Sequence, residues 1–293
     1  IDIGGYAYNV KSEPIKDSDG NPMVDSDGNP ITITNPDMTR FLMNLDEAVD
    51  LVKFAFEHGN PGDLFIQKAD ASTIGVLAQD GVTSTTVPLT VKFSKSYYMC
   101  KTEVTQAQWK AIMLTNPADN IDAAAGANTD NCPVNNITIE EAKLFVEALN
   151  LATGRKFALP TEAQWEWAAI GGIKSNNYTF SGSNNVAEVA AVNGELNEVA
   201  KLKANELGIY DMTGNVEEWT ANKYGKYSAT ESTDPVGPTS GSDYVTRGGH
   251  YEYGADADLL NVKSRNKIKG TDASYVRGLR LILEEPLPTE LLK

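Results

Sequence analysis

Two carboxylates bracket a glycine-containing turn in the second half of the chain. The segment runs from Asp211 through Gly214 to Glu218, and it contains neither histidine nor cysteine. Carboxylate and main-chain oxygens are hard ligands, which favour Ca²⁺ over zinc or iron. The same residues also suit a structural role, in which Glu218 accepts hydrogen bonds from loop amides and Asp211 caps a turn. The segment is therefore a candidate calcium site with a structural alternative.

Soft metal ligands and nucleophiles are scarce in this sequence. His58 and His250 are too few for a three-histidine iron site, and no Ser/His/Asp arrangement has a recognisable nucleophile setting. Cys100 and Cys132 are too few for a disulfide scaffold and are compatible with one bridge or with two buried thiols. Because His250 follows two glycines, its setting is typical of a turn or surface residue, with a role as a base as the alternative.

The late part of the chain, His250 to Asn261 and Lys267 to Tyr275, has the composition of a recognition surface. Tyrosine offers rigid amphipathic contact area at low entropic cost, and Asp and Asn offer polar pairing. We expect a protein or glycan ligand here, and an enzyme active site around His250, Asp256 and Asp258 is the alternative. The predicted ligand-binding residues are His250, Tyr251, Tyr253, Asp256, Asp258, Asn261 and Tyr275.

The charge of the chain argues against several classes of partner. Its 293 residues include 25 basic and 40 acidic side chains, for a formal net charge of -15. Such a charge repels phosphate, so we expect no nucleic-acid binding and no attraction to anionic membranes. An acidic surface also suits a secreted protein, and we expect an extracytoplasmic location, in the periplasm or at the cell surface. No apolar run approaches the ~20 residues that span a bilayer, and a leader or lipid anchor would lie outside this sequence.

The sequence predicts two parts of the chain. Residues 1–60 form an N-terminal extension or small module. Two copies of Asp-Ser-Asp-Gly-Asn-Pro, at 17–22 and 25–30, favour tight hairpin turns over EF-hand loops, since neither copy has the EF-hand order of ligands. Helical spacing of apolar residues over 45–58 predicts a helix. The remaining residues, 61–293, are predicted to form one larger domain.

Three capping boxes of the form Thr-x-x-Glu/Gln each precede helical spacing of apolar residues. The second box predicts a helix over 140–151 that is stopped by Gly154, and the third predicts one over 162–170 that is stopped by Gly171 and Gly172. From Tyr178 onward short segments alternate with Gly, Asn, Asp and Pro, which indicates a loop-rich half. The boxes pair Thr105 with Gln108, Thr138 with Glu141 and Thr161 with Gln164.

A series of motifs keeps a fixed order and spacing from about residue 62 to 283. The segments are KTEVTQAQW at 101–109, LPTEAQWEWAA at 159–169, NELGIYDMTGNVEEW at 205–219, RGG at 247–249, SRN at 264–266 and GLRL at 278–281. Together they resemble the formylglycine-generating enzyme, or sulfatase-modifying factor, family, whose third motif is similar to NxxGLYDMxGNVWEW. The resemblance implies an α+β fold, a large irregular C-type-lectin-like domain that is loop-rich and low in regular secondary structure.

Several of the matched residues have structural roles as their first explanation. Trp165 and Trp167 are two positions apart on a predicted helix, so they face different directions and are expected to anchor packing. Arginine in a loop-rich domain normally pairs with carboxylates or loop carbonyls. We expect such pairs for Arg247, Arg265 and Arg280, with Glu103, Glu162, Glu166 and Glu218 as candidate partners.

The resemblance also implies a chemistry that this chain lacks the residues to perform. Active members oxidise a substrate cysteine with O₂ and a copper ion held by two thiolates soon after the RGG motif. Here the stretch 247–265 contains no cysteine; His250 stands at the family's serine, and the cysteines would fall near Tyr253 and Asp258. We therefore expect a non-catalytic relative without copper. The family's calcium site maps onto the side chains of Asp211 and Glu218 and the main-chain oxygens of Gly214 and Val216.

The leading functional hypothesis is a non-catalytic extracytoplasmic binding domain that uses the late surface. One alternative is a structural or assembly component of the bacterial cell envelope, as some cysteine-free relatives are. Another is a displayed variable protein of a diversity-generating retroelement, because some proteins on this scaffold carry randomised positions in the same late stretch. An enzyme with a replaced active site is the third alternative.

Overall fold

The computed structural model describes residues 13–14, 32–33, 74–77, 89–226 and 232–284. The chain divides into two compact units, Ile1–Leu51 and Val52–Lys293. In the first unit β1 (Glu13–Pro14) pairs in antiparallel fashion with β2 (Thr32–Ile33). The predicted turns within 17–30 and the predicted helix over 45–58 lie outside the described residues.

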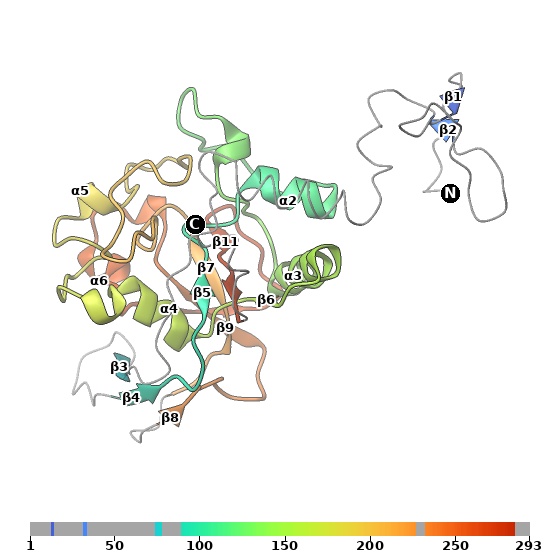
Figure 1. Cartoon of the computed structure of the whole chain (residues 1–293). Coiled ribbons are helices and arrows are strands. Elements are labelled where there is room, and N and C mark those ends of the chain that lie inside the picture. The colour runs from blue at the N-terminus through green and yellow to red at the C-terminus, as the bar shows by residue number, and fades with distance from the viewer. Residues whose placement is uncertain (1–12, 15–31, 34–73, 78–88, 227–231, 285–293) are drawn as a thin grey trace. The chain divides into compact units, whose positions relative to one another are not determined.

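The second unit mixes helices and strands with a large share of loop, which confirms the predicted α+β class. Figure 1 shows α2 and α3 on one side of the central strands and α4, α5 and α6 on the other. Its helices are α2 (Gln106–Met113), α3 (Ile139–Thr153), α4 (Glu162–Ala169), α5 (Val186–Val189) and α6 (Ala257–Leu260), and its short 3₁₀ turns are η2 (Thr129–Asn131), η3 (Gly172–Lys174) and η4 (Tyr251–Tyr253).

The three capping boxes are confirmed. Thr105, Thr138 and Thr161 each accept a hydrogen bond from the backbone N–H three residues later, and the Gln or Glu at that position accepts one in return. Helix α3 begins one residue before the predicted start, and it ends at Gly154 with a left-handed φ of 64°. Since local chemistry fixes both ends of α3, that helix follows from the sequence alone.

The described strands of this unit form three sheets. The main sheet has the order β10-β9-β7-β11, with β7 and β11 parallel and the other pairs antiparallel. Two smaller sheets have the orders β5-β12-β6 and β3-β4-β8. The strands are β3 (Ile74–Leu77), β4 (Leu89–Lys92), β5 (Tyr98–Met99), β6 (Phe157–Ala158), β7 (Glu217–Lys223), β8 (Ser232–Thr233), β9 (Asp243–Arg247), β10 (Arg265–Lys269), β11 (Arg277–Leu279) and β12 (Ile282–Leu283).

The two faces of the main sheet pack against different helices, because successive side chains of a strand point to opposite faces. Trp219 belongs to the same core cluster as residues of α2 and α3, in which Trp109 and Phe145 stack with ring centroids 4.8 Å apart. Its neighbour Glu218 faces α4, where it accepts a hydrogen bond from Trp165 Nε1. We call these the α3 face and the α4 face.

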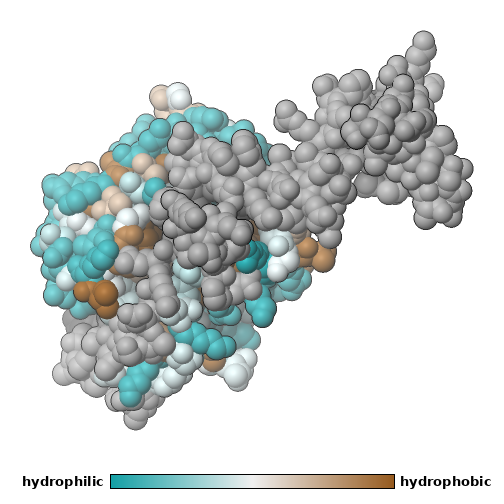
Figure 2. All heavy atoms as spheres, viewed as in Figure 1, coloured by the Kyte–Doolittle hydropathy of each residue, from teal (hydrophilic) through white to brown (hydrophobic). Residues whose placement is uncertain are grey.

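The coloured part of the face seen in Figure 2 is mostly polar. Figure 2 shows hydrophilic residues over much of the visible face, with hydrophobic residues in small separate areas. Among the described residues, no helix has both the length and the hydrophobicity needed to cross a bilayer.

Candidate functional site

The turn after β9 sets the direction of the predicted recognition stretch. Gly248 and Gly249 have φ values of 94° and 69°, in the left-handed region that glycine adopts at little cost. A Cβ atom on Gly249 would lie 2.8 Å from Leu260 Cδ2, so a side chain there would also clash. The two glycines thus turn the chain from β9 into η4 and bring His250 beside Tyr253.

A polar cluster lies on the α3 face of the main sheet, and we call it the Glu217 cluster: Glu217, Thr246, Tyr253, Asn266 and Arg277. Arg277 Nε donates to Glu217 Oε1 at 2.7 Å, and its Nη2 lies 2.6 Å from the same oxygen. Glu217 Oε2 accepts hydrogen bonds from Thr246 Oγ1 at 2.8 Å and from Asn266 Nδ2 at 3.0 Å. Asn266 Nδ2 also donates to the Tyr253 hydroxyl oxygen at 3.3 Å. Glu217 is 2% exposed, so this network forms a rigid floor.

His250 lies against this floor with its imidazole largely buried. Its ring centroid is 3.7 Å from that of Tyr253, and the planes are tilted by 40°. The residue is 8% exposed, and its buried Nδ1 has no hydrogen-bond partner among the described residues. Burial lowers the pKa of His250, against the opposing effects of Glu217 and Glu252. The imidazole is therefore neutral at pH 7, and its orphaned nitrogen costs on the order of 1–3 kcal/mol until a partner pairs with it.

The three predicted tyrosines divide between core and surface. Tyr251 is 1% exposed and packs with Leu196 and Val276. Its ring belongs to the core and offers no contact area to a ligand, which corrects the expectation for this residue. Tyr253 is half-buried, whereas Tyr275 is 36% exposed and donates from its hydroxyl to Glu252 Oε1 at 3.1 Å.

Two of the predicted polar residues, Asp256 and Asn261, accept hydrogen bonds from backbone N–H groups in and after α6. Asp256 caps the helix, because its Oδ1 accepts hydrogen bonds from Asp258 N at 3.0 Å and Leu259 N at 3.3 Å. Asn261 Oδ1 accepts one from Lys263 N at 2.9 Å. The side chains of Asp256 and Asp258 are exposed. No hydrogen bond among the described residues joins either carboxylate to His250, which weakens the case for an active site built from these three groups.

Both cysteines are free and buried, which decides between a bridge and two thiols in favour of the thiols. Cys100 lies in the core cluster around α2 and α3, and Cys132 lies beneath Tyr251 in a separate cluster. Burial raises the pKa of each thiol to about 12. Neither cysteine lies in the stretch between β9 and β10, where the family resemblance places the copper thiolates. Because the pKa of each is raised, both are thiols at neutral pH.

The predicted calcium segment contains an excess of buried negative charge. Asp211 Oδ2 accepts a hydrogen bond from Ala200 N at 2.7 Å. Glu218 accepts one from Trp165 Nε1 at 2.7 Å and pairs with Arg280, whose Nη2 lies 2.8 Å from Oε1. Glu103, also buried, adds a third carboxylate, on which the charges of Asp211 and Glu218 act. Burial raises the pKa of Asp211 to about 6 and that of Glu103 well above its usual range.

The chemistry of this donor set fits a hard divalent cation, because one guanidinium faces three buried carboxylates. Both oxygens of Glu218 already accept hydrogen bonds, so a cation would share an oxygen with Arg280 or Trp165. Within the described residues, no group of three or more His, Cys, Asp or Glu side chains is arranged to hold a metal. The site predicted here uses two side chains and two main-chain oxygens, and it remains a prediction.

The arginines of the shared motifs are structural, as predicted. Arg247 pairs with Glu166, and its Nε lies 3.6 Å from Glu162 Oε1. Arg265 donates from Nε and Nη2 to both oxygens of Glu162, at 2.8 and 2.7 Å. These four side chains lie on the α4 face and fasten α4 to β9 and β10. Trp165 packs against Arg247 in the same layer, with the guanidinium 5.2 Å from the ring centroid.

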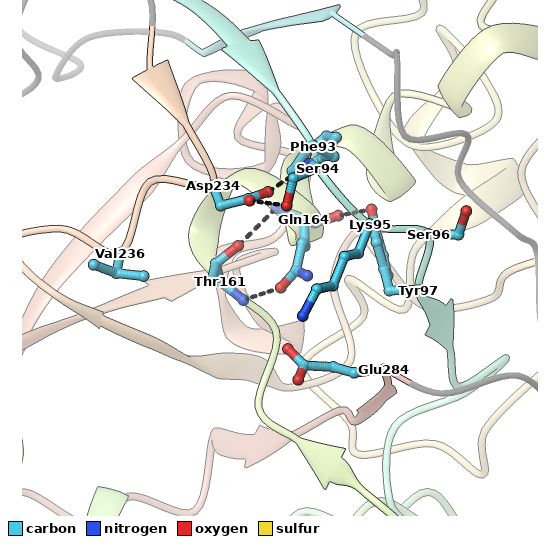
Figure 3. A pocket seen from close by; sticks show the side chains of 10 residues that line it. All are labelled: Phe93, Ser94, Lys95, Ser96, Tyr97, Thr161, Gln164, Asp234, Val236 and Glu284. Carbon is cyan, nitrogen blue, oxygen red and sulfur yellow. Dashed lines mark hydrogen bonds between the residues drawn. The ribbon is translucent and has the colours of Figure 1, made fainter.

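A small pocket of about 150 Å³ lies elsewhere, between the segment after β4 and the start of α4. Figure 3 shows Asp234 turned toward Ser94, which donates from its backbone N to Asp234 Oδ1 at 2.9 Å, while Lys95 extends toward Glu284. None of His250, Asp256 or Asp258 lines it. The pocket therefore gives no support to a catalytic role for those residues.

The structure shows one group that the sequence did not single out, the Glu217 cluster. Glu217 stands where the quoted family motif NVWEW has its first tryptophan, and this departure is the signal that could have marked it. The clustering itself depends on β7, β9, β10 and β11 meeting in one sheet, which no local pattern predicts.

The comparisons with known proteins agree with this architecture. Residues 62–285 match the profile of the family described as the sulfatase-modifying factor enzyme 1-like domain. The solved structure of Treponema denticola variable protein 1 superposes with a TM-score of 0.67 at 28% identity, and the match covers 74% of this chain and 94% of that one. Chaperone protein LppX of Paenibacillus barcinonensis is 33% identical over 177 residues, which cover 42% of this chain and 61% of that protein.

A second likeness covers the beginning of the chain. Residues 24–96 match the profile described as polysaccharide biosynthesis protein. A 49-residue stretch is 67% identical to UDP-glucose 4-epimerase of Rickettsia rickettsii, and it covers 17% of this chain and 14% of that enzyme. The chain thus spans about three fifths of LppX and a seventh of the epimerase. Residues 24–96 contain no G-x-G-x-x-G nucleotide-binding fingerprint.

The longer of the two family matches coincides with the described core. It takes in the three capping boxes, the arginine pairs and the turn that carries His250, and it extends over most of the chain. By its sequence, and by the mixed fold that positions these groups, the chain belongs to the sulfatase-modifying factor enzyme family.

Proposed function

We propose that this protein is a non-catalytic member of its family that binds a protein or glycan ligand on the surface around His250, Tyr253 and Tyr275. The observation that carries the proposal is the absence of cysteine from the stretch 247–265, together with the burial of both thiols elsewhere. Cu(I) requires soft ligands, and the groups present on this surface are carboxylates, phenols and one imidazole.

The build of the surface supports recognition. The Glu217 cluster and the tilted ring pair of His250 and Tyr253 form a floor whose side chains are held by packing and hydrogen bonds. Tyr275 stands at its margin with part of its ring exposed. A partner that settles on rigid aromatic groups loses little conformational entropy from this side of the interface.

The proposal predicts that a random-peptide or glycan library yields ligands that depend on this surface. Tyr275→Ala should weaken binding of a selected ligand by about tenfold, since exposed tyrosines are common hot spots. Tyr224→Ala is the matched control, because that half-buried tyrosine packs under Arg265 and Lys267 on the α4 side of β10. Equal losses for both variants, or a library that yields no ligand, would contradict the proposal.

A displayed variable protein is the second candidate function. The likeness to Treponema denticola variable protein 1, over three quarters of this chain, favours it. The late surface would then differ between copies of the gene. Sequencing the neighbouring genome tests the idea: a reverse transcriptase and a template copy of the stretch 250–275 are expected, and a locus without either argues against it.

An extracytoplasmic location and a role in envelope assembly are further proposals that follow from the acidic charge of -15 and the family's range of uses. Crosslinking in intact cells followed by fractionation distinguishes a role in envelope assembly from a role in ligand recognition. A constitutive stoichiometric envelope partner supports assembly, and a released or foreign ligand supports recognition.

We also propose that the segment 211–218 binds Ca²⁺ as a structural ion, held by Asp211, Glu218 and main-chain oxygens of Gly214 and Val216. The excess of buried carboxylate around Arg280 supports the proposal. Calorimetric titration of chelator-stripped protein should show calcium heat and a raised melting temperature, and Asp211→Asn should reduce both. The exposed Asp272→Asn is the control; absence of heat from the unmodified protein would rule the ion out.

A further inference from the structure

The margin of the candidate surface gathers acidic groups around an exposed aromatic ring. Tyr275 donates to Glu252 at 3.1 Å, and the buried Tyr251 donates to Asp122 Oδ2 at 3.3 Å. The hydrogen bond to Glu252 and the charges of Glu252, Asp122 and Asp119 raise the pKa of Tyr275. We call Asp119, Asp122, Glu252 and Tyr275 the acidic rim.

The backbone holds this rim in place. Asp119 is fixed from both sides, because its N–H donates to Asn135 Oδ1 at 2.8 Å and its carbonyl accepts from Asn135 Nδ2 at 2.9 Å. The carbonyl of Asp122 accepts from Leu196 N at 2.8 Å. The loop that carries the two carboxylates is therefore ordered before any partner arrives, which reduces the entropy lost on binding.

Two cations close to this region in the sequence, Arg277 and Lys267, pair with other groups. Arg277 is held by Glu217 in the floor. Lys267 pairs with Asp243 at 3.1 Å and lies over Tyr224. Since side chains alternate along β10, Lys267 and Lys269 share the α4 face with Arg265, while Asn266 points to the Glu217 cluster. The alternation keeps the lysines of β10 on the face opposite the Glu217 cluster.

A largely buried imidazole with an unpartnered ring nitrogen stands two residues before Glu252 in the chain. His250 is 8% exposed, its Nδ1 is buried without a partner among the described residues, and Glu252 is one of the charges that act on it. A neutral imidazole offers one lone pair, and the carboxylates of the rim offer acceptors only. The group that best completes this set is a donor with several N–H bonds and a positive charge.

Apolar surface for the stem of such a group is also present. Ile121 is 79% exposed between Asp119 and Asp122 in the chain, and Tyr275 presents part of its ring. Lysine and arginine side chains place their methylenes along apolar surface while the charged head finds oxygen acceptors. An aromatic ring adds attraction for the cation itself.

We infer that the partner of this surface is a protein that presents a lysine or arginine side chain to the acidic rim, with its charged head among Glu252, Asp122 and His250. This inference rests on the proposed binding function and narrows its ligand to a basic peptide segment. The net charge of -15 would speed the approach of such a partner and make the rate dependent on salt.

The test uses a capped tetralysine peptide and its fully ε-acetylated form, titrated calorimetrically into the full chain at low salt. The charged peptide should bind and the acetylated one should not. Glu252→Gln and Asp122→Asn should each weaken binding by about three- to fivefold, the range for a single partly exposed ion pair. Glu147→Gln, an exposed carboxylate on α3, controls for general attraction and should leave affinity unchanged.

His250→Phe provides a second variant, since it keeps a ring against Tyr253 but removes both nitrogens. It should weaken binding by at least as much as Glu252→Gln. Equal affinity for the Glu252, Asp122 and Glu147 variants would overturn the inference, because it would mean diffuse attraction without a site. Selected library peptides that are neutral yet depend on Tyr275 would also overturn it while leaving the proposed binding function standing. A library that yields no ligand would remove both.

Discussion

Buried ionisable residues show how this chain uses charge. On the α4 face two arginines face two glutamates, so Glu162 and Glu166 are balanced by Arg247 and Arg265. Around Arg280 the negative charges outnumber the positive ones, since the carboxylates of Glu103, Asp211 and Glu218 surround one guanidinium. Breaking a buried pair is far more costly than replacing an exposed one, because it leaves a charge without a partner in a medium of low polarity.

The imbalance around Arg280 predicts a pH dependence of stability. Burial raises the pKa of Asp211 to about 6 in the folded protein, against 3.8 for an exposed carboxyl. Between these values the folded state binds more protons than the unfolded state, so stability falls as pH rises from about 4 to about 6. In Asp211→Asn this fall should be smaller, because the amide still accepts from Ala200 N but does not titrate.

Urea denaturation at pH 4, 5, 6 and 7 in the presence of a chelator measures the effect. The exposed Asp272→Asn variant serves as the control and should follow the unmodified protein. Glu166, whose pKa burial raises to about 7, titrates in an overlapping range in all three proteins and therefore cancels from the comparison. Parallel curves for the Asp211 variant and the unmodified protein would show that Asp211 keeps an ordinary pKa.

The individual elements differ in how far their sequence determines them. Helices α2, α3 and α4 were predicted because a threonine cap with a reciprocal Gln or Glu is a local signal, and a glycine after α3 and α4 also marks where those two end. The partners of Arg247, Arg265 and Arg280 were also predicted, since a buried arginine has few alternatives to a carboxylate. Tyr251 was misplaced because the direction of a residue in a single 3₁₀ turn is set by the sheet beneath it.

The turn between β9 and η4 carries a prediction at the scale of the element. Gly249→Ala should lower the free energy of unfolding by about 1–3 kcal/mol, because alanine is strained at a φ of 69° and its Cβ would press on Leu260. It should also shift His250 and reduce ligand binding. Gly126→Ala is the control: it too has positive φ, but nothing lies within 4 Å of its Cβ position.

Chemical denaturation compares the two glycine variants. The Gly249 variant should lose more stability than the Gly126 variant, since both carry backbone strain and only one carries a clash. If the two losses are equal, the close approach of Leu260 has no energetic weight and the turn tolerates a side chain.

At the scale of the whole molecule, the chain joins stretches that resemble different proteins. The family match over 62–285 was expected from the order of the motifs, whereas the likeness of 24–96 to a polysaccharide biosynthesis protein was not. That segment has helical spacing and turn residues but no residue pattern that indicates a chemistry. Its likeness to another family is therefore found only by comparison with known proteins. The match overlaps the larger one at 62–96, which places the two resemblances on a continuous stretch of chain.

The central proposal is that this chain does not carry out the family's oxidation chemistry, because the stretch 247–265 has no cysteine. The surface where the family resemblance places two thiolates carries instead an imidazole, a tyrosine ring tilted against it and an acidic rim. Such groups suit the recognition of another molecule and leave Cu(I) without soft ligands.

Incubation of the purified full chain with Cu(I), O₂ and a cysteine-containing peptide tests this most directly, with mass spectrometry of the peptide and metal analysis of the protein. We predict no stoichiometric copper and an unchanged cysteine. One copper per chain together with conversion of the cysteine to an aldehyde would contradict the account.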